Sequence, residues 1–290
     1  MQPARIYPWL DRSGRFSWLK ALALAAVMAP ALWIAWQAWA VRLGANPLTE
    51  AIHQSGTWAV RLLLVSLAVS PLRRVAGWTK LILVRRMVGV AAMGYALLHL
   101  TLYIASQSFS PVRVVTEIAL RFYLTIGFVA VAILVALGAT SFDAAIRRLG
   151  RRWNQLHRLV YLAATLGIVH FFLQSKVDVS EPVVMAGFFI WLMAFRVLDR
   201  AGGPRPSALR LAALTLAAPL ATALAEAAWY AVRNGIDPWR ILQANLSLAI
   251  GPRPSVLVLA AAAVPPLIAL ARPLWERPPP ARTRPARATA

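Results

Sequence analysis

Eight apolar runs separated by short polar connections dominate the chain. The runs lie at roughly 19–41, 57–72, 87–105, 122–139, 158–174, 182–198, 208–232 and 255–271. A membrane-spanning helix needs about 20 predominantly apolar residues, and inside lipid its backbone hydrogen bonds must be satisfied within the segment itself. The pattern therefore predicts an all-α integral membrane protein, with a bundle of six helices followed by two additional C-terminal transmembrane helices.

The connections divide the chain into five parts. Residues 1–18 form an N-terminal segment, and residues 19–200 hold the first six helices. Residues 201–207, "AGGPRPS", have the composition of a linker, and residues 208–272 hold the last two helices. Residues 273–290 form a basic Pro/Arg tail. Because this composition cannot build a packed core, we expect the tail to be disordered.

The distribution of charge sets the expected orientation. The chain carries 31 Lys and Arg against 10 Asp and Glu, a formal net charge of +21. In a soluble protein this excess would suggest a nucleic-acid partner. Here the charges lie between apolar runs, so we expect no nucleic acid. Connections rich and poor in Lys and Arg alternate, which places the N-terminus in the cytoplasm by the positive-inside rule. The odd-numbered helices of the core then run outward.

Two of the four histidines are expected at the same depth in the membrane. His99 lies 13 residues beyond Arg86, and His170 lies 12 residues beyond Arg158, both on helices that run outward. At about 1.5 Å per residue, both imidazoles lie roughly 18–20 Å from the inner edge. A single histidine in a span often serves as a helix–helix hydrogen-bonding residue. A pair at matched depth favours bis-axial ligation of a haem iron in the outer half of the membrane.

Four further polar side chains are expected near the two edges of the membrane. His157, at the inner edge, is either a ligand of a second haem, a contact of another cofactor, or a solvated residue. Arg85 and Arg86 follow the positive-inside rule, and their guanidinium groups also suit haem propionates or a flavin phosphate. Glu226 is expected near the outer end of the seventh helix, reaching the interface. The chain has no cysteine, which excludes disulfides, iron–sulfur clusters and covalent c-type haem attachment.

Three stretches carry a family resemblance. They are "RRMVGVAAMGYALLHLTLY", "RFYLTIGFVAVAILVALGATS" and "LGRRWNQLHRLVYLAATLGIVHFF". They resemble the ferric-reductase-like transmembrane domain, and within it the MsrQ (YedZ) family, over about residues 16–200. The resemblance implies a six-helix b-type cytochrome of the bacterial inner membrane that binds haem b, one or two groups, and FMN. It places the haem histidines, and thus the iron ligands, at His99, His157 and His170.

The resemblance also implies a role in electron transfer. The family passes electrons from the quinone pool or a cytosolic flavin reductase to MsrP, a periplasmic molybdopterin enzyme. MsrP reduces methionine sulfoxide and so repairs oxidised envelope proteins, which makes this chain an electron-transfer subunit whose partner performs the reduction. Larger relatives in the superfamily carry a second histidine on the third helix, where this chain has Arg85 and Arg86. A complete second bis-histidine site is therefore in doubt.

Two alternatives to an electron-transfer subunit remain, a stand-alone reductase and a non-redox membrane protein. A stand-alone ferric reductase-like protein would need NAD(P)H- and FAD-binding domains, but the residues after position 200 are apolar helices and tail, without a G-x-G-x-x-G fingerprint. A non-redox membrane protein with structural histidines would be colourless, whereas a cytochrome would show a Soret band. The absorption spectrum therefore discriminates between these classes.

Overall fold

The computed structural model describes residues 7–10, 13–176, 178–200, 206–249 and 251–274. Within these ranges eight helices are long and apolar enough to cross a membrane, which confirms the all-α integral membrane fold. The helices are α1 (Trp18–Trp39), α2 (Pro47–Ala76), η1 (Thr79–Leu81), α3 (Ile82–Ser106), α4 (Pro111–Leu120), α5 (Phe122–Ala139), α6 (Asp143–Leu149), α7 (Arg151–His157), α8 (Leu159–Gln174), α9 (Ser180–Arg200), α10 (Ala208–Asn234), α11 (Pro238–Asn245), α12 (Pro254–Ala271) and η2 (Arg272–Leu274). Most of the predicted linker 201–207, and of the tail 273–290, lies outside the described residues.

The hydropathy pattern placed most spans within a few residues, but it was wrong about the second. That span was expected at 57–72, whereas α2 begins at Pro47 and has 30 residues. Its first turns contain polar side chains, which hid them from the hydropathy pattern. These groups are satisfied by neighbours: Gln54 Nε2 donates to Gln37 on α1 and to Glu50 on its own helix, both at 2.9 Å. The pattern also missed four short helices, α4, α6, α7 and α11, which do not cross the membrane alone.

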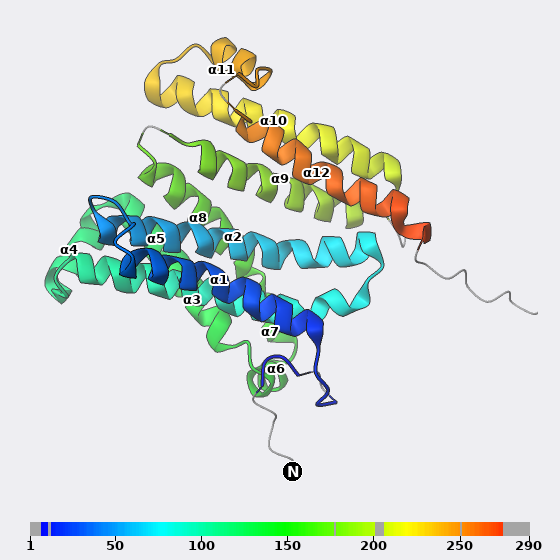
Figure 1. Ribbon diagram of the computed structural model, residues 1–290, viewed down its shortest axis with the longest axis horizontal. Coiled ribbons are helices and arrows are strands. Elements are labelled where there is room, and N and C mark those ends of the chain that lie inside the picture. The colour runs from blue at the N-terminus through cyan, green and yellow to red at the C-terminus, as the bar shows by residue number, and fades with distance from the viewer. Residues whose placement is uncertain (1–6, 11–12, 177, 201–205, 250, 275–290) are drawn as a thin grey trace, which may run out of the picture.

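The long helices pack side by side, with α2 near the centre of the molecule (Figure 1). Helix α3 packs along α2, α5 packs against α8, and α9 lies against both α2 and α8. Small side chains allow this close approach, since Ala92 on α3 and Ala163 on α8 are completely buried. Helix α4 lies at one end of the bundle, called here the α4 end, and the α2–α3 connection lies at the opposite end (Figure 1).

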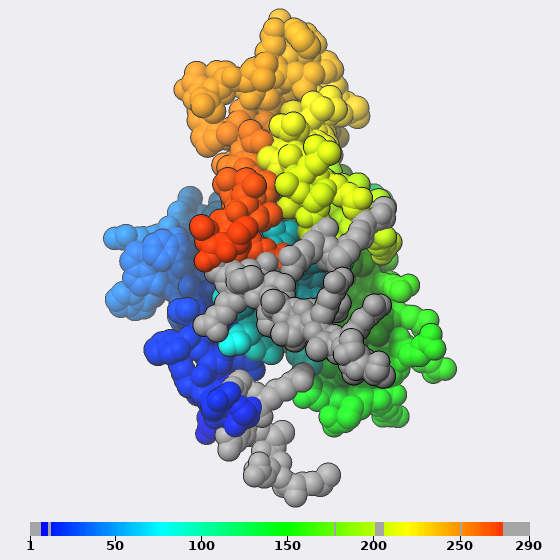
Figure 2. Space-filling view, turned by 90° about the vertical axis from the view of Figure 1, so that its right-hand side faces the viewer, coloured from blue at the N-terminus to red at the C-terminus, as the bar shows by residue number. Residues whose placement is uncertain are grey.

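The two additional helices form part of the same packed structure. Helices α10 and α12 pack against each other and against α9, on the side away from the first helices of the chain (Figures 1 and 2). Gly187 on α9 makes the close approach possible, because a Cβ there would lie 2.6 Å from Val258 and would also overlap Thr222. Thr215 Oγ1 donates to the Ala262 carbonyl at 2.8 Å and so joins α10 to α12. The helices on the two sides of the predicted linker 201–207 therefore pack against each other.

Tyr95 inserts its hydroxyl into the backbone of α1. The hydroxyl donates to the Val27 carbonyl at 2.8 Å and accepts from the Ala31 N–H at 2.7 Å. These two backbone groups would pair with each other in a regular helix, and Pro30 lies directly between them in sequence. An inserted side chain next to a proline is a recognised cause of a helix bend. Tyr95 therefore joins α1 to α3 at the point where the backbone hydrogen bonds of α1 are interrupted.

We expect Tyr95→Phe to destabilise the protein by about 1–3 kcal/mol, because two buried backbone groups lose their partner. The measurement is thermal or denaturant unfolding of the purified protein in detergent. Tyr103→Phe is the matched control, since the Tyr103 hydroxyl lies on the same helix and is buried without a hydrogen-bond partner in the described structure. Equal stability of Tyr95→Phe and the wild type would contradict the bridging role.

Candidate functional site

Two histidines from helices distant in sequence meet between the spans towards the α4 end. His99 on α3 and His170 on α8 have ring centroids 6.2 Å apart, and their planes are nearly perpendicular at 81°. Both side chains are partly buried, where helices α2, α3, α5 and α8 meet. The structure thus brings together the two imidazoles that the sequence expects at one depth.

Each imidazole is fixed by one hydrogen bond to a neighbouring helix. His99 Nδ1 lies 2.8 Å from the Ile52 carbonyl on α2, and His170 Nδ1 lies 2.8 Å from the Tyr123 carbonyl on α5. A carbonyl oxygen can only accept, so Nδ1 must carry the proton in both rings. In the neutral imidazole the lone pair then lies on Nε2. Both histidines are therefore held in the tautomer that ligates a metal through Nε2, with the backbone acceptor that such ligands usually have.

A glycine supports each ring. Gly56 on α2 faces His99, and a Cβ at this position would lie 2.8 Å from His99 Nδ1. Gly127 on α5 faces His170, and a Cβ there would lie 2.8 Å from both Nδ1 and Cε1. Each glycine stands four residues after the carbonyl that its histidine bonds, so one helical turn supplies both the acceptor and the space. The two histidines are thus positioned in the same way on two different helices, each by a backbone carbonyl and a glycine four residues later.

The spacing of the rings fits one metal ion held between them. A metal–imidazole bond is about 2.0–2.1 Å for zinc, and the ring centroid lies roughly 1 Å further away, so two rings on one ion have centroids about 6 Å apart. The observed separation is 6.2 Å. The described residues contain no group of three or more His, Cys, Asp or Glu that could hold a metal ion. A cofactor that brings its own equatorial ligands, such as a porphyrin, suits a site with two imidazoles.

Two tyrosines lie near the histidine pair on the side of the α4 end. Tyr123 has its ring centroid 6.5 Å from that of His170. Tyr103 lies one helical turn beyond His99, and its hydroxyl is buried without a hydrogen-bond partner in the described structure. Glu117 on α4 pairs with Arg121 at 2.5 Å, and Arg121 donates to the Tyr123 hydroxyl at 3.2 Å. Helix α4 therefore connects to the histidine pair through an ion pair and a tyrosine.

His157 lies apart from the pair, at the junction of α7 and α8. Its ring stacks on Trp153 with centroids 3.8 Å apart, and its Nδ1 lies 3.1 Å from the Trp153 carbonyl. Its Nε2 lies 3.3 Å from Ser141 Oγ. The structure thus gives His157 an indole and a hydroxyl as neighbours in place of a second histidine, and its predicted role as a ligand stays a prediction.

The adjacent arginines Arg85 and Arg86 have different surroundings. Arg86 pairs with Asp143 of α6 at 2.6 Å. Arg85 lies close enough to His157 for an electrostatic interaction. Its other charged or polar neighbours are Tyr161, Arg196 and Arg73. No carboxylate pairs with Arg85 in the part of the chain that the structure describes. Of the two predicted anion-binding arginines, Arg85 is the one free to bind an anion.

The chain has the features of a ferric-reductase-like membrane protein, with spanning helices that hold a pair of imidazoles in one layer. Residues 55–168, which include His99 and His157 and end two residues before His170, match the family described as ferric reductase like transmembrane component. No solved structure matches the chain.

Similar proteins define the family more closely. A protein of Xanthomonas campestris pv. campestris (strain 8004) is 41% identical over 197 residues, which cover 65% of this chain and 90% of that protein. One of Xanthomonas axonopodis pv. citri is 38% identical over 66% of this chain and 91% of its own. One of Caulobacter vibrioides is 38% identical over 60% and 84%. All three are named protein-methionine-sulfoxide reductase heme-binding subunit MsrQ. The chain belongs to the MsrQ family.

Proposed function

We propose that this protein is a b-type cytochrome subunit of the bacterial inner membrane that carries electrons outward to a methionine sulfoxide reductase. The donor is the quinone pool or a cytosolic flavin reductase. The acceptor is a periplasmic reductase of the MsrP type, which repairs oxidised envelope proteins. The similar proteins are named as heme-binding subunits of a protein-methionine-sulfoxide reductase, and the word subunit implies a partner.

The observation that carries the proposal is the His99–His170 pair. Both rings are fixed in the Nε2-ligating tautomer, and their separation of 6.2 Å suits two axial ligands. A bound haem b would supply a one-electron redox centre inside the low-dielectric layer, where a bare charge is costly. The chain's own contribution is to orient the two ligands through Ile52 and Tyr123 and to exclude water by helix packing.

The surroundings of His157 support a role in electron entry. Arg85 lies near this histidine, Tyr161 and Arg196 lie near Arg85, and the Arg196 guanidinium lies over the Tyr161 ring at 5.4 Å. A cationic group without a carboxylate partner suits an anion such as a flavin phosphate or a haem propionate. We assign FMN, or a second haem with His157 as its single histidine ligand, to this region.

Electrons leave, in this proposal, at the α4 end. The histidine pair lies towards that end, and the connections rich in Lys and Arg lie at the opposite end, which the positive-inside rule assigns to the cytoplasm. The acceptor would dock on the surface predicted at 42–57, 105–121 and 174–182. Residues 47–57 are helical in the structure, so the first part of this surface consists of the loop before Pro47 and the exposed residues at the start of α2, among them Leu48 and His53.

Spectroscopy and oriented vesicles test the proposal. The purified protein should show a Soret band and a sharp α-band on reduction, and a colourless protein would rule the function out. Incorporated in one orientation, the protein should reduce MsrP added outside when the donor is supplied inside. Equal reduction of MsrP from the cytoplasmic face would contradict the proposed direction. Reduction by NADPH alone would instead indicate a self-sufficient reductase.

We expect His157→Ala to retain the spectrum of the haem between His99 and His170 but to slow its reduction. The reason is that His157 and Arg85 lie on the proposed entry side, away from the pair. The measurement is stopped-flow reduction by a quinol and by a flavin reductase with NAD(P)H. His53→Ala, an exposed histidine on α2, is the control. Loss of all haem, or unchanged rates with both donors, would each refute this role.

A further inference from the structure

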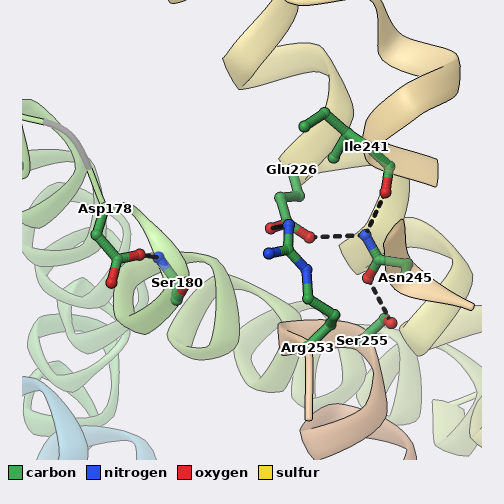
Figure 3. Close-up of polar contacts among 7 residues, drawn as sticks. All are labelled: Asp178, Ser180, Glu226, Ile241, Asn245, Arg253 and Ser255. Atoms are coloured by element: carbon green, nitrogen blue, oxygen red, sulfur yellow. Dashed lines mark hydrogen bonds and ion pairs between the residues drawn. The ribbon is translucent and has the colours of Figure 1, made fainter. Parts of the chain in front are cut away.

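Glu226 is fully buried on α10, where the sequence pattern had placed it at the interface. Its exposed fraction is 0%, so the expectation that it reaches the interface was wrong. Its carboxylate accepts from Arg253 at 2.7 Å and from Asn245 Nδ2 at 2.8 Å (Figure 3). Asn245 in turn accepts from Ser255 at 2.6 Å. We call these four residues the Glu226 clamp. A buried carboxylate needs such partners, because its charge is costly in a low-dielectric environment.

The Glu226 clamp fixes how far α11 folds back along α10. Asn245 is the last residue of α11, whereas Glu226 lies 8 residues before the end of α10 at Asn234. At about 1.5 Å per residue, the C-terminal end of α11 lies roughly 12 Å back from the end of α10. Figures 1 and 2 show α11 on the side of α10 that faces away from the rest of the bundle. The segment therefore re-enters alongside α10 and does not extend beyond it.

The level of this segment relative to the membrane follows from the neighbouring spans. Trp229 on α10 contacts Phe172, near the end of α8, with ring centroids 4.9 Å apart. Helix α10 has 27 residues and is about 40 Å long, against a hydrocarbon layer of about 30 Å. Its last turns therefore lie at headgroup level. A segment that returns by roughly 12 Å reaches the boundary between headgroups and acyl chains.

The exposed side chains of this segment change from charged and aromatic to aliphatic with increasing depth. At the shallow end lie Trp239, 63% exposed, and the exposed Arg233 and Arg240. At the deep end lie Leu246, 89% exposed, and Leu248, 66% exposed. Trp and Arg are typical of the interface and Leu of the acyl region. The only carboxylate among residues 233–249, Asp237, is occupied as the N-cap of α11, accepting from the Trp239 N–H at 3.0 Å.

We propose that residues 233–249 form a re-entrant anchor that binds phospholipid of the leaflet at the α4 end, with phosphate against Arg233 and Arg240 and acyl chains against Leu246 and Leu248. The Glu226 clamp holds the anchor at its depth. Within α11, Asn245 Nδ2 also donates to the Ile241 oxygen at 3.0 Å, which fixes the orientation of the Asn245 amide.

The absence of cysteine in the native sequence allows a direct test. Leu246→Cys and Leu248→Cys are labelled with bimane in the full-length protein, reconstituted in vesicles with and without brominated phosphatidylglycerol. Leu220→Cys, mid-span on α10 and 61% exposed, is the lipid control, and Arg148→Cys on α6 is the water control. We expect quenching by bromolipid at 246 and 248 comparable to that at 220. Quenching by aqueous iodide instead, as at 148, would overturn the proposal. Shielding from both quenchers would also overturn it and indicate a protein partner.

A second variant tests the clamp. Adding Glu226→Gln to the Leu246→Cys protein removes the charge that Arg253 pairs with while preserving side-chain volume. We expect the bromolipid quenching at 246 to fall towards that of the water control, with unchanged quenching at 220. Unchanged quenching at 246 would show that the clamp does not set the depth of the anchor. Because the labels report on an otherwise native chain, a folding defect of the Gln variant would leave the first test intact.

Discussion

Replacing His99 or His170 with alanine should remove most of the bound haem or leave a high-spin form. In the proposed site each imidazole would supply one of the two axial bonds. The two rings lie 6.2 Å apart, and each is oriented by its own backbone carbonyl. The loss should therefore be similar for the two variants. The measurement is the reduced-minus-oxidised spectrum together with the haem content per protein.

The control for this experiment is His53→Ala, because His53 is exposed on α2 and lies outside the pair. It should retain the wild-type spectrum and haem content. His157→Ala should behave in the same way in the static spectrum and differ only in reduction kinetics. An unchanged low-spin spectrum in both His99→Ala and His170→Ala would refute the assignment of the ligands, and with it the central element of the proposed function.

The spans could be predicted because a lipid-facing helix must be apolar along about 20 residues. The same criterion missed the first ten residues of α2, since Glu50, Gln54 and Ser55 form their hydrogen bonds inside the bundle. It also misjudged Glu226. Its burial depends on Arg253, which lies 27 positions later, immediately before α12. Hydropathy reports on single segments, whereas the satisfaction of polar groups depends on neighbours that only the packed structure provides.

The histidine pair could be predicted in part for a related reason. Depth along a helix follows from residue counting, so the expectation of two imidazoles in one layer needed no tertiary structure. Rotation about the helix axis and the register between helices do not follow from counting. The roles of Gly56 and Gly127 were therefore missed, because the sequence contains 15 glycines and no local pattern distinguishes the two that face a histidine. The different surroundings of Arg85 and Arg86 depend on the same rotational information.

These glycines give the second large expected effect. Gly56→Ala and Gly127→Ala each place a methyl group 2.8 Å from the Nδ1 of a histidine, closer than real Cβ atoms approach. The ring must move, and its hydrogen bond to Ile52 or Tyr123 is lengthened or lost. Changes to the groups that orient a metal-binding side chain typically reduce metal affinity by about 10–100-fold. We expect a comparable loss of haem affinity and a shift towards high-spin haem.

The stability of the haem-free protein separates loss of ligation from general unfolding. Alanine is favoured over glycine in a helix interior by about 1 kcal/mol, which offsets the cost of displacing the ring, so the haem-free variants should unfold about as easily as the haem-free wild type. Gly94→Ala on α3 and Gly167→Ala on α8 are matched controls on the histidine helices themselves. A Cβ at Gly94 meets nothing within 4 Å, and one at Gly167 meets Val60 at an ordinary 3.7 Å. Both controls should retain the wild-type haem spectrum.

Wild-type spectra and haem affinity in Gly56→Ala and Gly127→Ala would show that the positions of the rings do not depend on these two glycines. Equal losses in all four variants would trace the effect to the helices in general.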